Sequence, residues 1–327
     1  MRAAWYEKNG EARAVLQVGE LPTPEPGPGD VRVRLRASGV NPADVKRRKG
    51  NSRTPAPTGR VTPHFDGAGE IDKLGAGVSD RRVGERVWVY EGMWRRNAGT
   101  AAEFIVLPAA RTEPLHDNCS FAEGACFGIP AMTAHRALFA DGPVSGKTVL
   151  VTGGAGAVGV YGLQMARLGG ARVIATVSGE EKARIARDFG ADWVVNYKTE
   201  DAAARILELT GGEGVDRVVE VAFGANLPTS LKVVKENGAV AGYASDAEPE
   251  PRIPFYALLS KNVTLYPLLV FNMPEPAKAH ARADIARWTR DKALKPYLGT
   301  AFPLDRIAEA HEAVERGSMG NVTVVLG

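Results

Sequence analysis

"VLVTGGAGAVGVYGLQMARLG", residues 149–169, decides the fold, because its pattern changes from strand to helix across a short run of glycines. The opening "VLVTG" is typical of a buried strand, and "VGVYGLQMARLG" is typical of a helix. Where the strand would turn into the helix, Gly154, Gly156 and Gly159 satisfy the pattern GxGxxG. Glycine is needed there because the turn is tight, the backbone must approach a pyrophosphate, and the helix must pack closely on the strand. The stretch therefore predicts a dinucleotide site, with the anion at the helix N-terminus.

The type of dinucleotide depends on the end of the second strand, about 20 residues further on, where an acid would bind a ribose with a free 2′-hydroxyl. Ser178 takes that place, and Glu180 and Glu181 fall in the following turn or helix start. A serine hydroxyl together with Lys182 suits a 2′-phosphate, which a carboxylate would repel. The pattern favours NADPH over NADH. The alternative is that the two glutamates are ordinary first-turn acids and Lys182 is a solvated side chain.

The segments around this stretch indicate two kinds of architecture. Strand and helix patterns alternate through "ARVIATV", "EEKARIARDFG", "WVVNY", "AAARILELTG", "VDRVVEVA" and "GAVAGYA", which predicts βαβ units and a parallel sheet covered by helices on both faces. From Val31 to about Pro108, short runs with period-two alternation lie between glycines and predict a mostly antiparallel sheet. The tail predicts two helices and a closing strand, "NVTVVLG".

Composition limits the classes of function. The 327 residues exceed the usual size of one hydrophobic core, so we expect two domains. The net charge of +3 comes from 41 basic and 38 acidic residues without a long run of one sign, which argues against a nucleic-acid or membrane surface. The basic segment 46–50 is interpreted as a solvated turn. With no signal-peptide pattern and no apolar run of about 18 residues, we expect a cytoplasmic protein. Cys119 and Cys126 are expected to be buried rather than paired or bound to metal.

The chain as a whole resembles the medium-chain dehydrogenase/reductase superfamily, and most closely its zinc-free, zeta-crystallin-like quinone oxidoreductase branch. The resemblance rests on "SGVNPADVKRR", "DGAGEIDKLGAGVSDRRVGERV", "GTAAEFIVLPA", "GACFGIPAMTAHRAL", "VLVTGGAGAVG", "GADWVVNY" and "GGEGVDRVVEV", in the order and spacing of the family. It implies an α/β chain with a GroES-like, mostly-β catalytic domain from residues 1–121 and 267–327. It also implies a Rossmann domain with a doubly wound parallel sheet from residues 122–266.

The resemblance also bears on metal chemistry. Alcohol dehydrogenases of the superfamily bind a catalytic zinc at three places that Asn41, Phe65 and Ile129 occupy here, and none of these can supply a thiolate or an imidazole. His64 is interpreted as a polar loop residue, and we expect no zinc. Without a Lewis acid, the acceptor must take hydride readily, which implies an NADPH-dependent quinone oxidoreductase. The alternatives are an enone or alkenal reductase using the same hydride, and a non-catalytic protein that binds NADPH or nucleic acid.

The resemblance assigns two sets of site residues, and no catalytic residue among them. The substrate and nicotinamide pocket is expected to contain Asn41, Lys46, Trp94, Thr133 and His135. The cofactor-binding set is Gly154, Ala155, Gly156, Ala157, Val158, Gly159, Ser178, Lys182, Tyr197, Ala222, Tyr243 and Asn321. For Ala222, Tyr243 and Asn321, ordinary packing or surface placement is the alternative.

Some features depart from the branch or extend beyond the site. Lys46 and His135 stand where the branch often has tyrosine, and Lys46 could steer an anionic acceptor or donate a proton. Trp94 and Arg95 belong to a loop that either shapes the acceptor pocket or is simply solvated. The resemblance further implies a homodimer that pairs through an edge strand of the Rossmann sheet, at about residues 262–266.

Overall fold

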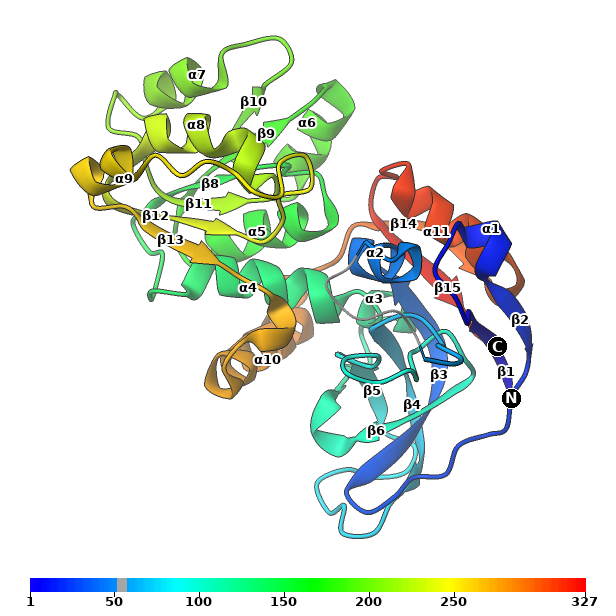
Figure 1. Cartoon of the computed structure of the whole chain (residues 1–327). Helices are drawn as coiled ribbons and strands as arrows, with labels where there is room; N and C mark the ends of the chain where they lie inside the picture. Colours follow the sequence, from blue (N-terminus) through cyan, green and yellow to red (C-terminus); the bar gives the residue numbers. More distant parts are fainter. Residues whose placement is uncertain (52–57) are drawn as a thin grey trace. The chain divides into compact units, whose positions relative to one another are not determined.

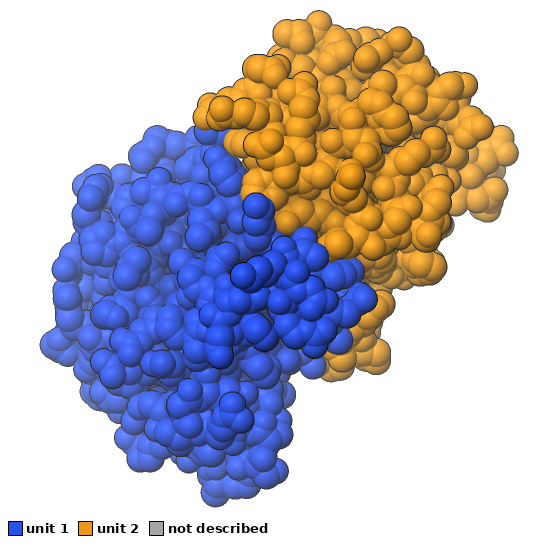
Figure 2. Space-filling view, turned by 180° about the vertical axis from the view of Figure 1, so that it is seen from behind, with its two compact units in different colours: residues 1–129, 282–327 blue, residues 130–281 orange. Residues whose placement is uncertain are grey.

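The computed structural model describes residues 1–51 and 58–327, and its contacts divide the chain into two compact units (Figure 2). Unit 1 consists of Met1–Ile129 and Arg282–Gly327, and unit 2 of Pro130–Ala281. Both borders fall later in the chain than the expected residues 121/122 and 266/267. One border lies inside the π-helix η2 (Phe127–Ala131) and the other inside α10 (Glu275–Arg290).

Unit 2 is built on a six-stranded sheet in which every strand pair is parallel (Figure 1). The strands follow the spatial order β10-β9-β8-β11-β12-β13. From β8 the chain moves outward to β10 and then returns to β11 on the other side of β8, so the strand order reverses between β8 and β11. This confirms the expected doubly wound Rossmann sheet. The strands are β8 (Thr148–Val151), β9 (Arg172–Val177), β10 (Trp193–Asn196), β11 (Val215–Glu220), β12 (Val234–Gly242) and β13 (Thr264–Pro267).

Helices cover both faces of the parallel sheet (Figure 1). On one face α7 and α8 pack together, and on the other α4 packs against α5. Because side chains alternate between the faces of a strand, two residues of β11 reach opposite helix layers: Arg217 donates to the Ala137 carbonyl of α4, and Glu220 accepts from Ser230 of α8. The helices of unit 2 include α4 (Met132–Phe139), α5 (Ala157–Leu168), α6 (Glu180–Asp188), α7 (Ala202–Leu209), α8 (Phe223–Val233), α9 (Phe255–Lys261) and the 3-10 helix η3 (Val270–Asn272).

Unit 1 is built on a seven-stranded, mostly antiparallel sheet, which confirms the expected mostly-β fold. Its order is β14-β15-β3-β4-β5-β7, β6 also pairs with β3, and β14 with β15 is a parallel pair. Val322 of β15 lies opposite Val40 of β3, so both chain segments of the unit share one sheet. The strands are β3 (Asp30–Val40), β4 (Asp66–Leu74), β5 (Arg86–Val89), β6 (Phe104–Pro108), β7 (Thr112–Pro114), β14 (Leu298–Pro303) and β15 (Asn321–Val325), beside the separate antiparallel pair β1 (Arg2–Trp5) and β2 (Gln17–Glu20).

The alternating sequence of β3 explains its position at the centre of this sheet. Val31, Val33 and Leu35 are buried in a core that also contains residues of α11 (Ile307–Glu315). The intervening arginines point the other way, and Arg32 forms an ion pair with Asp72 of β4 at 2.8 Å. The period of two therefore separates a core face from a charged face. Unit 1 also contains α1 (Ala12–Val15), α2 (Pro42–Lys49), α3 (Phe121–Gly124) and the 3-10 helices η1 (Ala109–Arg111) and η4 (Leu304–Arg306).

The basic segment 46–50 is not a solvated turn, and that prediction is wrong. Its first four residues form the second half of α2, which ends at Gly50 in the left-handed conformation with φ 82°. Arg48 has no exposed surface, because its guanidinium donates to the Gly10 carbonyl and forms an ion pair with Glu315. Because these partners come from distant parts of the chain, the charged sequence pattern gives no indication that Arg48 is buried.

Two further expectations concern burial and membranes. Cys119 and Cys126 are both buried, as expected. Across residues 1–51 and 58–327, no helix combines the length and the apolar character that a bilayer crossing requires.

Candidate dinucleotide-binding site

The glycine loop joins β8 to α5, and its backbone leaves no room for larger residues at two places. Gly153 has φ 64°, a left-handed conformation that favours glycine. A Cβ atom on Gly159 would lie 2.3 Å from the Gly153 carbonyl oxygen, so the first turn of α5 could not approach the loop with any other residue there. The sequence pattern identified Gly159 but not Gly153. The tight contact between loop and helix thus has a steric cause.

The N-terminus of α5 presents backbone donors at this loop. Gly156 precedes the helix and is exposed, and the Val160 N–H donates to the Gly156 carbonyl at 3.0 Å. The N–H groups of Ala157, Val158 and Gly159 lie in the first turn, where an α-helix offers no partner of its own. Together with the helix dipole, they suit a pyrophosphate.

The loop lies at the carboxyl edge of the sheet, where the strand order reverses. Thr152 follows β8, and its N–H donates to the Val219 carbonyl of the neighbouring β11 at 3.0 Å. The Thr176 carbonyl of β9 accepts from the Gly154 N–H at 3.0 Å on the other side. The loop is therefore anchored on both neighbouring strands. In open α/β sheets, ligands bind in the crevice at such a reversal.

Ser178 and Lys182 meet at one corner of this edge. Ser178 follows β9, Lys182 lies in the first turn of α6, and Lys182 Nζ donates to Ser178 Oγ at 3.1 Å. The nearby Glu180 is 83% exposed and forms an ion pair with Arg187 at 2.9 Å, so its carboxylate is turned to another partner. The corner offers a hydroxyl and an ammonium to a phosphate.

Tyr197 joins the same corner through the backbone. Its N–H donates to the carbonyl of Val177, the residue before Ser178, at 3.1 Å, and its side chain is 48% exposed. Lys198 Nζ lies 5.4 Å from the centroid of the Tyr197 ring and adds a second ammonium, which the sequence reasoning missed. An exposed tyrosine hydroxyl and an ammonium group are donors that suit a phosphate.

Ala222 and Tyr243 lie at the carboxyl ends of β11 and β12. The Ala222 N–H donates to the Glu220 carboxylate at 2.7 Å, and the Tyr243 N–H donates to the Glu220 carbonyl at 3.1 Å. Burial, and secondarily the charge of Glu220, raises the pKa of the Tyr243 hydroxyl. Both residues thus donate a hydrogen bond to Glu220, which the sequence reasoning did not single out.

Thr133 and His135 both lie on α4 and are 4% and 2% exposed. The His135 ring packs among other rings of unit 2, with centroid distances of 4.7 Å to Phe139 and 4.9 Å to His280. The replacement of a common tyrosine by His135 is therefore accommodated inside an aromatic cluster.

In unit 1, Asn41 is held by a buried carboxylate. Asn41 Nδ2 donates to Asp66 Oδ2 at 2.9 Å, and the Ile129 N–H donates to the same oxygen at 2.8 Å. Asp66 is fully buried, Oδ1 has no hydrogen-bond partner, and burial raises the pKa of this carboxyl to about 7. Burial also raises the pKa of Asp44, which accepts from the Asn41 N–H at 2.7 Å.

This arrangement does not fit a catalytic zinc ion. The three positions carry Asn41, Phe65 and Ile129, which supply no thiolate or imidazole, and the donors of Asn41 and Ile129 are directed at a carboxyl oxygen of Asp66. Burial and the neighbouring charge of Asp66 raise the pKa of the Cys126 thiol, which donates to the Ala122 carbonyl. Phe65 is apolar and buried, with 3% of its surface exposed.

His64 lies in the loop before β4, as expected of a polar loop residue, but it is fully buried. Nδ1 lies 2.7 Å from Ser38 Oγ, and Nε2 lies 3.0 Å from Nε2 of His311. Burial lowers the pKa of His64 to about 3 and lowers that of His311 as well, which keeps both rings neutral. His311 lies 247 positions away in the sequence, and for this reason no local pattern indicated the pair.

The other predicted residues of unit 1 are distributed over three elements. Lys46 lies in α2 and is partly buried, and Trp94 is partly buried in the loop after β5 with the exposed Arg95 over its ring at 5.5 Å. Asn321 begins β15 and donates to the Tyr297 carbonyl through both its N–H (2.7 Å) and Nδ2 (3.1 Å). Asn321 thus also has a structural role.

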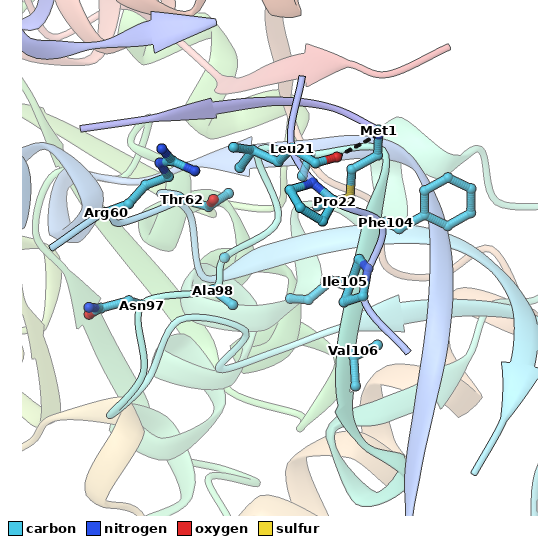
Figure 3. Close-up of a pocket in the computed structure, with 13 residues that line it drawn as sticks. Met1, Leu21, Pro22, Arg60, Thr62, Asn97, Ala98, Phe104, Ile105 and Val106 are labelled. Carbon is cyan, nitrogen blue, oxygen red and sulfur yellow. Dashed lines mark hydrogen bonds between the residues drawn. The ribbon is translucent and has the colours of Figure 1, made fainter. Parts of the chain in front are cut away.

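A cavity of about 240 Å³ in unit 1 is separate from these residues (Figure 3). Figure 3 shows it beside the hydrogen bond between the Met1 nitrogen and the Leu21 carbonyl, with Phe104, Ile105 and Val106 following one another along β6. None of the predicted site residues lines this cavity. We assign it no role in the dinucleotide site.

A mostly-β unit combined with a Rossmann unit and its glycine loop defines a medium-chain dehydrogenase/reductase. Residues 27–117 match the family described as alcohol dehydrogenase GroES-like domain, and residues 157–284 match the family described as zinc-binding dehydrogenase. The quinone oxidoreductase of Rattus norvegicus is 31% identical over 100% of this chain and 98% of its own.

Two solved structures agree with this assignment over full length. The crystal structure of an NAD-dependent alcohol dehydrogenase is 32% identical with a TM-score of 0.90, and it covers 100% of both chains. A mycobacterial protein complexed with NADPH is 30% identical with a TM-score of 0.88, again over 100% of both chains. The chain belongs to the quinone oxidoreductase family of the medium-chain dehydrogenase/reductase superfamily. It is an oxidoreductase.

Proposed function

We propose that the protein is an NADPH-dependent quinone oxidoreductase that transfers hydride without zinc. The observation that carries the choice of coenzyme is the contact between Lys182 Nζ and Ser178 Oγ at the end of β9, where an NADH enzyme would present a carboxylate. The name of the rat relative and the NADPH in the mycobacterial structure support this proposal. The NAD-dependent neighbour makes NADH the rival coenzyme.

Each predicted residue has a part in this proposal. In the glycine loop of residues 154–159, the backbone N–H groups of Ala157, Val158 and Gly159 bind the pyrophosphate, while Ser178, Lys182 and Tyr197 bind the 2′-phosphate. Ala222, Tyr243 and Asn321 contact the coenzyme, and Asn41, Lys46, Trp94, Thr133 and His135 line the nicotinamide and acceptor pocket. When bound, NADPH supplies a hydride, and its nicotinamide ring changes from neutral to positively charged.

The chain itself orients the acceptor, excludes water and delivers a proton. Reduction of a quinone to a quinol consumes one hydride and one proton, and Lys46 can donate the proton from α2. A quinone accepts hydride readily, so no Lewis acid is required, in keeping with Asn41, Phe65 and Ile129, which supply no thiolate or imidazole.

Initial rates test this function directly. Purified, chelator-treated protein is assayed with NADPH and NADH against 1,4-benzoquinone, 9,10-phenanthrenequinone and an α,β-unsaturated ketone. We expect chelator-resistant quinone turnover with NADPH preferred. Turnover of the ketone alone would identify an activated alkene, and not a quinone, as the hydride acceptor. Loss of activity on chelation would contradict the zinc-free mechanism. Coenzyme binding with no turnover would indicate a binding protein.

A variant of Lys182 tests the coenzyme corner. Lys182→Ala removes a charge-assisted contact to the 2′-phosphate, so the Kd for NADPH should rise about tenfold to a hundredfold. The Kd for NADH should change little. Lys232→Ala, at an exposed position on α8, is the matched control and should leave both constants unchanged. Equal weakening of NADPH and NADH by Lys182→Ala would contradict the assignment.

We also propose a homodimer that pairs through the edge of the parallel sheet. The strand β13 lies at that edge, and α9 beside it has no buried residue. Phe255, Tyr256 and Leu259 of α9 are 64%, 80% and 59% exposed, which is unusual for large apolar side chains. A second copy of the same chain would cover them and pair the edge strand.

Light scattering at micromolar concentration tests the dimer. The protein should have twice the 34.8 kDa mass of one chain. Tyr256→Glu should shift the mass toward the monomer, whereas Leu298→Glu, on a 41% exposed residue of unit 1, should not. A monomer mass for the unchanged protein would overturn the proposal. The cytoplasmic location expected from the sequence stays a prediction.

A further inference from the structure

Glu220 is a fully buried carboxylate at the place where the strand order of the parallel sheet reverses. It is the last residue of β11, and its exposed fraction is 0%. The neighbouring strand across the reversal is β8, whose following residue is Thr152. Glu220 therefore lies at the crevice in which a doubly wound sheet binds its ligand.

Four donors surround this carboxylate. Oε1 accepts from Thr152 Oγ1 at 2.8 Å, from the Ala222 N–H at 2.7 Å and from Asn226 Nδ2 at 2.8 Å. Oε2 accepts from Ser230 Oγ at 3.1 Å. All four partners are donors, so the surroundings present hydrogen atoms to both carboxylate oxygens.

The negative charge has no cationic partner. Throughout the two described stretches of the chain, no lysine, arginine or histidine forms an ion pair with Glu220. The nearest basic residue along its strand, Arg217, faces the opposite side of the sheet and pairs with Asp141. A buried charge that is hydrogen-bonded but not neutralised projects a field into its surroundings, because the protein interior screens charge less than water does.

The field reaches the carboxyl edge on the side where the nicotinamide would bind. Under the proposed function, Ser178 and Lys182 hold the 2′-phosphate at the end of β9, so the adenosine half lies over β8, β9 and β10. The nicotinamide half then lies over β11, β12 and β13. Tyr243, at the end of β12, already responds to the charge of Glu220, since this charge helps to raise the pKa of its hydroxyl.

We propose that Glu220 acts as a fixed negative charge that stabilises the oxidised, positively charged nicotinamide relative to its reduced, neutral form. The proposal rests on the proposed function and deepens it. By favouring the cation that remains after hydride leaves, Glu220 makes the bound coenzyme a stronger reductant. It acts through its field and its four hydrogen bonds, without contact to the reacting atoms.

The competing explanation is that Glu220 only holds the ends of β8 and β11 together through its hydrogen bonds, which is a bracing role. One substitution separates this role from that of a negative charge. In Glu220→Gln, the amide oxygen can accept from Thr152, Ala222 and Asn226 as before. The amide nitrogen takes the place of Oε2 and can donate to Ser230 Oγ, because a hydroxyl both donates and accepts. The variant therefore removes the charge while keeping the hydrogen bonds. Ser230→Ala is the matched control, because it removes one hydrogen bond and keeps the charge.

The measurement is the ratio of dissociation constants for the oxidised and reduced coenzyme, determined by calorimetry or fluorescence without turnover. For Glu220→Gln, the Kd for NADP⁺ should rise about tenfold more than the Kd for NADPH, as expected for one charge acting over several ångströms of protein. In Ser230→Ala, the ratio should stay at the unchanged protein's value. Thermal unfolding of both variants establishes that they are folded.

Two results would overturn the inference. An unchanged ratio in Glu220→Gln, with or without an equal loss of both affinities, would leave only a bracing role. If the unchanged protein prefers the NAD⁺/NADH pair, the choice of NADPH fails but the same ratio, measured with that pair, still decides the role of Glu220. If it binds neither pair, the proposed function and the inference both fail.

Discussion

Asp66 in unit 1 and Glu220 in unit 2 are both fully buried carboxyl groups, yet the chain surrounds them differently. Glu220 accepts four hydrogen bonds distributed over both oxygens. Asp66 accepts two hydrogen bonds on one oxygen, while its other oxygen has no partner. Burial raises the pKa of Asp66 to about 7, so this group changes charge near neutral pH.

The difference teaches that the number and distribution of donors, rather than burial, decide what a buried carboxyl group can do. A carboxylate with donors on both oxygens is held in place and can act on a ligand through its charge. A group with an incomplete set is a proton reservoir, and the stability of its unit depends on pH. Each unit thus contains one such group in contact with a predicted site residue. Asp66 accepts from Asn41 in unit 1, and Glu220 accepts from Ala222 in unit 2.

The largest expected effect comes from deleting each carboxyl group. Glu220→Ala removes the acceptor of two N–H donors and of the Ser230 hydroxyl in the interior, while the Thr152 hydroxyl keeps the Val219 carbonyl at 3.2 Å as an acceptor. The substitution should cost about 3–5 kcal/mol of unfolding free energy. Asp66→Ala leaves only two donors and also removes a poorly solvated acid, so about 1–2 kcal/mol should be lost. Urea unfolding at pH 7 measures both values. Equal losses would contradict the distinction between the two groups.

A second, smaller effect is the pH dependence caused by Asp66. Because its pKa is raised from 3.8 to about 7, the folded state keeps a proton between pH 4 and 7 that the unfolded state releases. Stability therefore falls as pH rises through this range, and the full penalty remains above pH 7.

Asp66→Asn removes this titration while its amide oxygen still accepts from Asn41 and Ile129. Relative to the unchanged protein, the variant should gain about 2–3 kcal/mol of unfolding free energy between pH 4 and pH 8. Urea unfolding at the two pH values measures the gain. A variant whose unfolding free energy follows that of the unchanged protein at both pH values would contradict the assignment of this titration to Asp66.

The smallest of the three effects concerns the buried histidine pair and has the opposite sign. The pKa of His64 is lowered from 6.5 to about 3, and that of His311 is lowered too, so stability is present above pH 6.5 and is lost on acidification. His311→Gln keeps a hydrogen-bonding partner for His64 but cannot titrate. Between pH 7 and pH 5 the variant should lose about 1–2 kcal/mol less than the unchanged protein. Equal losses, in denaturant unfolding at both pH values, would contradict this reading of His311.

The fold could be predicted from the sequence because its signals are local. A glycine loop between strand and helix patterns, and period-two alternation such as that of β3, each involve neighbouring residues. The glycines, Ser178 and Lys182 could be singled out for the same reason. Their roles toward the coenzyme stay predictions.

The buried polar groups could not be predicted, because their partners come from distant segments. His64 meets His311, Asp66 meets Asn41 and Ile129, and a charged pattern gives no sign that Arg48 reaches Glu315. For Glu220, the strand pattern gives its place at the end of β11. The four donors become neighbours only after two strands and α8 have packed.

The pairing of β15 with β3 has a consequence for how the protein is made on the ribosome. Unit 2 is one continuous segment, so all of its strands are available once residue 281 has emerged, and it can fold while synthesis continues. Unit 1 cannot complete its sheet until β15 arrives, because Val322 must find Val40 across nearly the whole chain. Until then, residues 37–40 of β3 lack a partner strand on the edge that β15 will join, while residues 30–34 can already pair with β6. In this chain, the unit that begins synthesis is the last to finish folding.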